Sequence, residues 1–175
     1  MDRDDAWRRM ATARVARLAT IGPDGRPDLV PVTYALRGGA GHDDRLIIAV
    51  DHKPKSTRRL ARLDNIRARP EVSVLVDHYD DDWSQLWWVR LDGWARVVDG
   101  PPVGHDRAEL IDRYPPYRDT PPAGPVIDIA VTSWQWWSAA PPTGTANRTN
   151  QHTNQRTDER TPHHLEHPDP EVDHP

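Results

Sequence analysis

Residues 15–36 read VARLATIGPDGRPDLVPVTYAL, and this stretch predicts a β-hairpin. Two aliphatic, β-prone runs, residues 15–21 and 29–36, flank the turn Gly22-Pro23-Asp24-Gly25. Proline presets one backbone dihedral of such a turn, and glycine supplies a positive φ. Pro31 has no N–H to donate to a ladder, so we expect it at an edge or a bulge, where the backbone faces something other than another strand.

Four more segments have strand character: residues 45–50, 72–77, 86–98 and 126–132. Gly93 would allow a bulge in the longest of them. Helices are expected over residues 3–13, after residue 55 and near 106–114. Most strands are joined by short turns and only one long connection is helical. The sequence therefore predicts a mainly β protein, a six-stranded antiparallel barrel, closed or partly closed, rather than a doubly wound parallel sheet.

The chain has 175 residues, a net charge of −4 and no cysteine. These values favour one domain and exclude disulfides and thiolate chemistry. They also disfavour general binding of nucleic acid. No run has the length of a membrane span, and the acidic N-terminus does not resemble a signal peptide. We therefore expect a cytoplasmic protein with no membrane and no nucleic-acid partner.

The composition changes near residue 141. Residues 141–175 contain Ala146, Leu165 and Val172 as their apolar side chains and are rich in Thr, Asn, Gln, His, Pro and acidic residues. Such a segment buries too little apolar surface to offset its ordering entropy. We expect a folded domain over 1–140 and a disordered polar tail over 141–175.

Truncation after residue 140 is accordingly expected to leave the fold and ligand binding unchanged. Thermal unfolding of the truncated chain beside the full chain measures this, and a large fall in melting temperature would contradict it.

Residues 50–63, VDHKPKSTRRLARL, predict a strand end, a tight turn and the start of a helix. A hydroxyl of Ser56 or Thr57 can cap this helix. Five cations gather here, at Lys53, Lys55, Arg58, Arg59 and Arg62. Cations at a helix N-terminus oppose the helix dipole unless an anion is present, so the pattern favours a phosphate site. A solvated basic helix face is the alternative.

No other motif carries chemistry of its own. Phosphate-binding glycine loops, dinucleotide fingerprints and nucleophile elbows are absent from the sequence. Asp80, Asp81 and Asp82 are adjacent, which suits a solvated loop better than a metal site, and no metal is predicted. His52 and His78 could each touch a ligand, and a surface or internally bonded histidine is the alternative. With no evident nucleophile or general base, the chemistry would come from a bound cofactor, and no catalytic residue is predicted.

Eight tryptophans and no phenylalanine make the aromatic pattern unusual. Trp87 and Trp88 are adjacent on a predicted strand, so their side chains should face opposite sides. One can enter the core. The other suits a subunit interface, where large amphipathic rings are enriched. Packing of both rings within the subunit, around a bulge, is the alternative.

Several segments together resemble the pyridoxamine 5′-phosphate oxidase-like family of split β-barrel flavoproteins. The resemblance covers roughly residues 7–139. It begins in the hairpin, with residues 16–20, 23–27 and 30–34. Further segments narrow the resemblance to one branch of the family, the actinobacterial proteins that use the deazaflavin coenzyme F420. These segments are residues 51–63, 65–66, 76–83, 86–90 and 92–93.

The resemblance implies a six-stranded split barrel that forms a homodimer, with two cofactor sites at the interface. The outward ring of the 87/88 pair would come from the partner subunit. The phosphate of the cofactor would be held by Lys53, Lys55, Ser56 and Thr57. Its ring would be lined by Pro31, Val32 and Thr33 and flanked by Ala49, Val50 and Asp51.

The implied activity is hydride transfer between F420 and a small organic acceptor, with Tyr34 or Tyr79 as a candidate proton donor. FMN is the alternative cofactor, because both carry a phosphate and a tricyclic ring. The anionic tail of the deazaflavin could use Arg58, Arg59 or Arg62, which favours F420. A non-catalytic cofactor carrier remains the alternative of another class.

Overall fold

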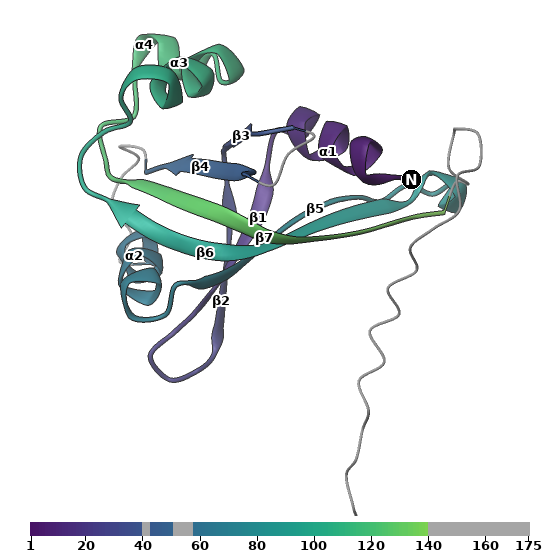
Figure 1. Ribbon diagram of the computed structural model, residues 1–175, viewed down its shortest axis with the longest axis horizontal. Coiled ribbons are helices and arrows are strands. Elements are labelled where there is room, and N and C mark those ends of the chain that lie inside the picture. The colour runs from purple at the N-terminus through teal and green to yellow at the C-terminus, as the bar shows by residue number, and fades with distance from the viewer. Residues whose placement is uncertain (40–42, 51–57, 140–175) are drawn as a thin grey trace, which may run out of the picture. The chain divides into compact units, whose positions relative to one another are not determined.

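The computed structural model describes residues 1–39, 43–50 and 58–139 (Figure 1). Its strands are β1 (Ala16–Ile21), β2 (Pro27–Val32), β3 (Ala35–Arg37), β4 (Arg45–Ala49), β5 (Glu71–His78), β6 (Trp87–Val98) and β7 (Val126–Ser138). Its helices are α1 (Arg3–Thr12), α2 (Arg58–Ala68), α3 (Gly104–Arg113), α4 (Pro116–Asp119) and the short 3-10 turn η1 (Trp83–Gln85).

The seven strands form one sheet in the order β2-β1-β5-β6-β7-β4-β3, and every neighbouring pair is antiparallel. The two edge strands, β2 and β3, follow each other in the chain and are separated only by Thr33 and Tyr34. A link of two residues between the edges requires the sheet to curl until the edges meet. The predicted antiparallel split barrel is confirmed, with seven strands instead of six.

The extra strand arises because the predicted strand 29–36 is interrupted at Thr33 and Tyr34. The N–H of Tyr34 donates to the hydroxyl of Tyr114, at 2.9 Å, rather than to another strand. The Tyr34 ring is fully buried, and its hydroxyl donates to the carbonyl of Met10. Tertiary contacts of this one residue therefore end β2 and let β3 start in a new direction.

Alternate residues of the strands point inward and form the barrel core. Val72, Val74 and Val76 of β5 face inward beside Val89 and Leu91 of β6. On α2, Leu63 and Ile66 are buried in the same core. The predicted bulge is also found, between Asp92 and Gly93 in the pairing of β6 with β7.

A second apolar cluster packs α3 and α4 against β3 and β4. Leu110, Tyr114 and Tyr117 lie on Ala35, Ile47 and Ala49. The sequence predicted α3 but not the single turn of α4, which starts at Pro116 and carries Tyr117 into the cluster. The cluster fixes the chain beside the junction of β2 and β3.

Helix α1 is fixed to the sheet through its first residues. Asp2 and Asp5 form a capping box, and Ala6 and Met10 are buried. Arg3 pairs with the buried carboxylate of Asp44, which also accepts from the indole N–H of Trp134 at 3.1 Å.

Strand β7 runs to Ser138, six residues beyond its predicted end, because Trp134 and Trp136 pack against the core. Contacts group Met1–Thr143 and Gly144–Pro175 as two units. The predicted tail, 141–175, lies outside the described residues, so its disorder stays a prediction. Among the helices of the described residues, none has the length and apolarity to cross a membrane.

Candidate functional site

The outer face of the barrel carries the alternate residues of five strands. Register places Pro31 of β2 opposite Arg17 of β1, and Arg17 opposite Leu75 of β5. Leu75 is opposite Arg90 of β6. Since neighbouring strands lie about 4.8 Å apart, Pro31 is about 10 Å from Leu75 across the sheet. Pro31 is exposed on this face at the sheet edge, as its missing N–H predicts.

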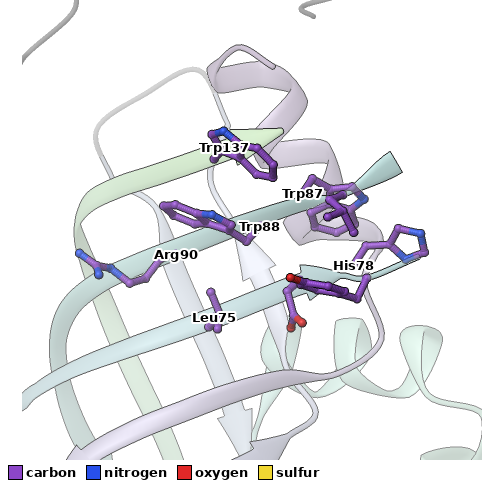
Figure 2. Close-up of a pocket in the computed structure, with 9 residues that line it drawn as sticks. Leu75, His78, Trp87, Trp88, Arg90 and Trp137 are labelled. Carbon is purple, nitrogen blue, oxygen red and sulfur yellow. The ribbon is translucent and has the colours of Figure 1, made fainter. Parts of the chain in front are cut away.

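A groove of about 770 Å³ opens on the same face (Figure 2). This volume falls within the range of about 300–1,000 Å³ that is typical of small-molecule sites. The groove is formed by β5, β6, the start of the loop between them, and the end of β7. Its lining residues are Leu75, Asp77, His78, Tyr79, Leu86, Trp87, Trp88, Arg90 and Trp137.

Ring-bearing side chains dominate this lining. Trp88 and Trp137 are register partners on the outer face, and 46% of Trp137 is exposed. Trp87 packs against the core from the inner face, with the guanidinium of Arg9 4.5 Å from its ring centroid. The prediction that Trp87 and Trp88 face opposite sides is confirmed. Trp87 and the stacked ring of His78, at 6.0 Å, border the groove at one end.

Two ion pairs each place one residue, Asp77 or Arg90, in the lining of the groove. Arg17 pairs with Asp77 at 2.5 Å. Arg90 approaches Asp92 through one nitrogen, Nη2, at 3.2 Å. Its Nε atom is covered and has no partner among the described residues. Figure 2 shows Arg90 and His78 at opposite ends of the groove.

The predicted ring-lining residues lie at and beside the sheet edge. Val32 is 6% exposed and faces the core. The hydroxyl of Thr33 lies 3.0 Å from that of Tyr117. Ala49 is buried in the cluster that contains Tyr117. Thr33 therefore lies within hydrogen-bond distance of a member of the cluster that contains Ala49.

Both backbone groups of Val50 form hydrogen bonds with the segment before β7. Its N–H donates to the carbonyl of Pro125 at 3.0 Å, and its carbonyl accepts from the N–H of Gly124 at 3.1 Å. A Cβ at Gly124 would lie 2.4 Å from that carbonyl oxygen, so only glycine fits there. Val50 is the last described residue before the segment that is predicted to hold the phosphate. Asp51, Lys53, Lys55, Ser56 and Thr57, and also His52, lie outside the described residues, and their roles stay predictions.

Two candidate proton donors differ sharply in their surroundings. Tyr34 is fully buried, and burial raises the pKa of its hydroxyl, which opposes proton exchange with a ligand. The suggestion that Tyr34 protonates a product is therefore wrong. Tyr79 is 81% exposed and lines the groove, so it keeps that candidate role.

The acidic loop 80–82 makes local bonds. The carboxylate of Asp82 accepts from the N–H and the hydroxyl of Ser84 at 3.0 and 2.7 Å, and that of Asp80 accepts from the N–H of Asp82 at 2.9 Å. These bonds shape the turn before η1, which agrees with the predicted loop.

Sequence reasoning missed the groove as a site. Leu75, Arg90 and Trp137 come from three strands, and none of them has an individual motif. Strand alternation places each on the outer face. Their common location follows only from the register of β5, β6 and β7.

Solved structures with this fold include a conserved hypothetical protein from Mycobacterium tuberculosis, with 22% identity and a TM-score of 0.62 over 84% of this chain and 93% of that chain. A heme binding protein from Mycobacterium smegmatis has 22% identity and a TM-score of 0.57 over 77% of this chain and 52% of that chain. An F420 reductase has 22% identity and a TM-score of 0.52 over 73% of this chain and 94% of that chain. At these identities the likeness shows the fold alone.

No curated protein matches the chain. The family model for pyridoxamine 5′-phosphate oxidase matches residues 4–138, which include every described strand and helix except the first residue of α1. The chain therefore belongs to the pyridoxamine 5′-phosphate oxidase family.

Proposed function

We propose that this protein is an oxidoreductase that binds coenzyme F420 on the outer face of its barrel and uses it to reduce or oxidise a small organic molecule. The observation that carries the proposal is the ring-lined groove in the same row of residues as Pro31. A flavin-type cofactor is consistent with the family, and one solved structure of this fold is an F420 reductase.

The described residues suit a planar ring. Tryptophan faces bind flat conjugated groups by stacking, and Trp88 and Trp137 line the groove beside the place proposed for the ring. At the sheet edge, residues 31–33 would line the ring through backbone contacts, with residues 49–51 beside it. Lys53, Lys55, Ser56 and Thr57 would hold the phosphate. When bound, the cofactor supplies the hydride chemistry at its ring.

The choice of F420 over FMN rests on the anionic tail of the deazaflavin. Arg62 is 8% exposed, so it is covered by the protein and is a poor candidate for that tail. Arg58 and Arg59 remain the candidates, and their side chains lie outside those described.

We also propose a homodimer. Three large apolar side chains are exposed on the outer face, at 63% for Leu29, 54% for Trp94 and 46% for Trp137. Exposed apolar residues that share one face typically mark a contact surface. A second copy that covers this face would bring Trp88 of one subunit to the cofactor site of its partner. Analytical ultracentrifugation checks the association, and a monomer at micromolar concentration would contradict it.

Titration with each cofactor tests the identity of the ligand. Because eight tryptophans report on the protein, quenching of their fluorescence follows the binding of F420 and of FMN under the same conditions. We expect tighter binding of F420, and oxidation of reduced F420 when a quinone such as menadione is added. Tighter binding of FMN would make FMN the cofactor in place of F420. Binding of F420 without turnover of any acceptor would indicate a carrier.

Replacing Lys53 or Lys55 by alanine is expected to weaken F420 binding tenfold or more. Loss of a charge-assisted contact to a phosphate costs about 1.5–3 kcal/mol, and about 1.4 kcal/mol is a factor of ten. These are the only two lysines of the chain, so cofactor protection against lysine acetylation, read by mass spectrometry, gives a second measurement. Arg107→Ala, which removes an exposed charge from α3, is the control for the change in net charge. Unchanged affinity in both lysine variants would remove the phosphate assignment.

A further inference from the structure

We propose that Arg90 makes the groove a site for a flat, conjugated molecule that carries a carboxylate. The proposal deepens the proposed function, because such a molecule, bound beside the cofactor ring, would be the hydride acceptor or donor. It names a class of substrate and the residue that selects it.

The position of Arg90 is the first support. Arg90 lies on the outer face of β6, between Leu75 of β5 and Gln135 of β7 in the same row. Trp88 is two residues earlier on the same face, opposite Trp137. A cation that stands beside stacking surfaces selects ligands that combine a flat apolar body with an anionic group.

The bonding of Arg90 is the second support. Its side chain is 41% exposed, so part of it is accessible from the groove. It contacts Asp92 through Nη2 alone, whereas arginine typically forms two parallel bonds with a carboxylate. Its Nε atom is covered and has no partner among the described residues. Turning the guanidinium towards a ligand carboxylate would satisfy Nε as part of a bidentate pair.

The carboxylates near Arg90 are already engaged by other donors. Asp92 also accepts from the hydroxyls of Ser73 at 2.6 Å and Ser133 at 3.2 Å, so its charge is shared among several donors. Asp77, the carboxylate of the lining, is paired with Arg17. Neither carboxylate bonds Nε of Arg90, so among the described residues this donor is left for an external acceptor.

A matched pair of probes tests the proposal with the full chain and without F420. The probes 1-pyrenecarboxylate and 1-pyrenemethanol share one flat ring system and differ in charge. We expect the carboxylate to bind about tenfold more tightly, the effect of one charge-assisted pair. Arg90→Gln is expected to abolish this preference while it keeps the affinity for 1-pyrenemethanol. Arg107→Gln, which removes a charge from α3, is expected to keep the preference.

Three outcomes of the probe titrations would overturn the proposal. They are equal affinity of the native protein for both probes, a carboxylate preference that survives in Arg90→Gln, and no binding of either probe. An F420 titration of Arg90→Gln separates the two proposals. Tenfold weaker F420 binding in this variant would assign Arg90 to the cofactor and overturn the substrate assignment. If F420 does not bind the native protein but the carboxylate preference holds, the proposed function fails and the anion site stands. A thermal melt of Arg90→Gln shows whether it is folded.

Discussion

Gly93→Ala is expected to lower the free energy of unfolding by about 3 kcal/mol, the upper part of the usual range for overpacking. A Cβ at this position would lie 2.4 Å from the carbonyl oxygen of Ala130 and 2.9 Å from Cγ2 of Ile129. The atoms it meets belong to β7, and Gly93 lies at the bulge of β6. Both strands are paired on both sides in the sheet, so neither can move away without disturbing a second ladder.

Urea unfolding followed by tryptophan fluorescence measures the effect. Gly39→Ala is the matched control, because a Cβ at Gly39 meets nothing within 4 Å. The control is expected to change stability by no more than about 0.5 kcal/mol. Equal stability of the two variants would show that β6 and β7 are not as close at the bulge as described.

Tyr114→Phe is the other substitution with a large expected effect, a loss of about 2–3 kcal/mol. The hydroxyl of Tyr114 accepts from the N–H of Tyr34 at 2.9 Å and lies 2.9 Å from the carbonyl of the same residue. It also accepts from Nε of Arg113 at 3.1 Å. Phenylalanine would leave backbone groups of Tyr34 unpaired in the core, and each such group costs about 1–3 kcal/mol.

Urea unfolding also measures this variant, and hydrogen exchange of the Tyr34 amide reports the bond directly. Tyr79→Phe is the control, since Tyr79 is 81% exposed and lies outside the two core clusters. We expect faster exchange at Tyr34 in Tyr114→Phe and no change in stability for the control. Retained protection of the amide would mean that another group bonds it.

Local features made most of the barrel predictable. Turn residues such as Pro23 and Gly25 marked the first hairpin, and Gly93 marked the bulge, because these residues act on their own part of the backbone. The break between β2 and β3 was not predictable in the same way. It depends on a bond from Tyr34 to Tyr114, eighty residues away, and no local pattern encodes that distance.

The candidate site also has one part that local sequence predicts and one part that depends on long-range contacts. Pro31 was placed correctly at a sheet edge, since the missing N–H is a property of the residue itself. The groove depends on side chains of β5, β6 and β7 that meet only once the register is set. The basic turn at Lys53 and Lys55 stays a prediction that the binding experiments decide.

The junction of β2 and β3 has a consequence for how the barrel behaves in a crowded solution. The two edge strands of the sheet, β2 and β3, are joined by a short link, so each edge lies near the other strand of the same chain. Pro27 and Pro31 remove two amide donors from β2, which makes that strand a poor template for a foreign strand. Because β2 and β3 are not neighbours in the sheet, the barrel can part along this line without breaking a ladder. The barrel thus has a seam that no ladder crosses, and its proline-bearing edge resists pairing with a foreign strand.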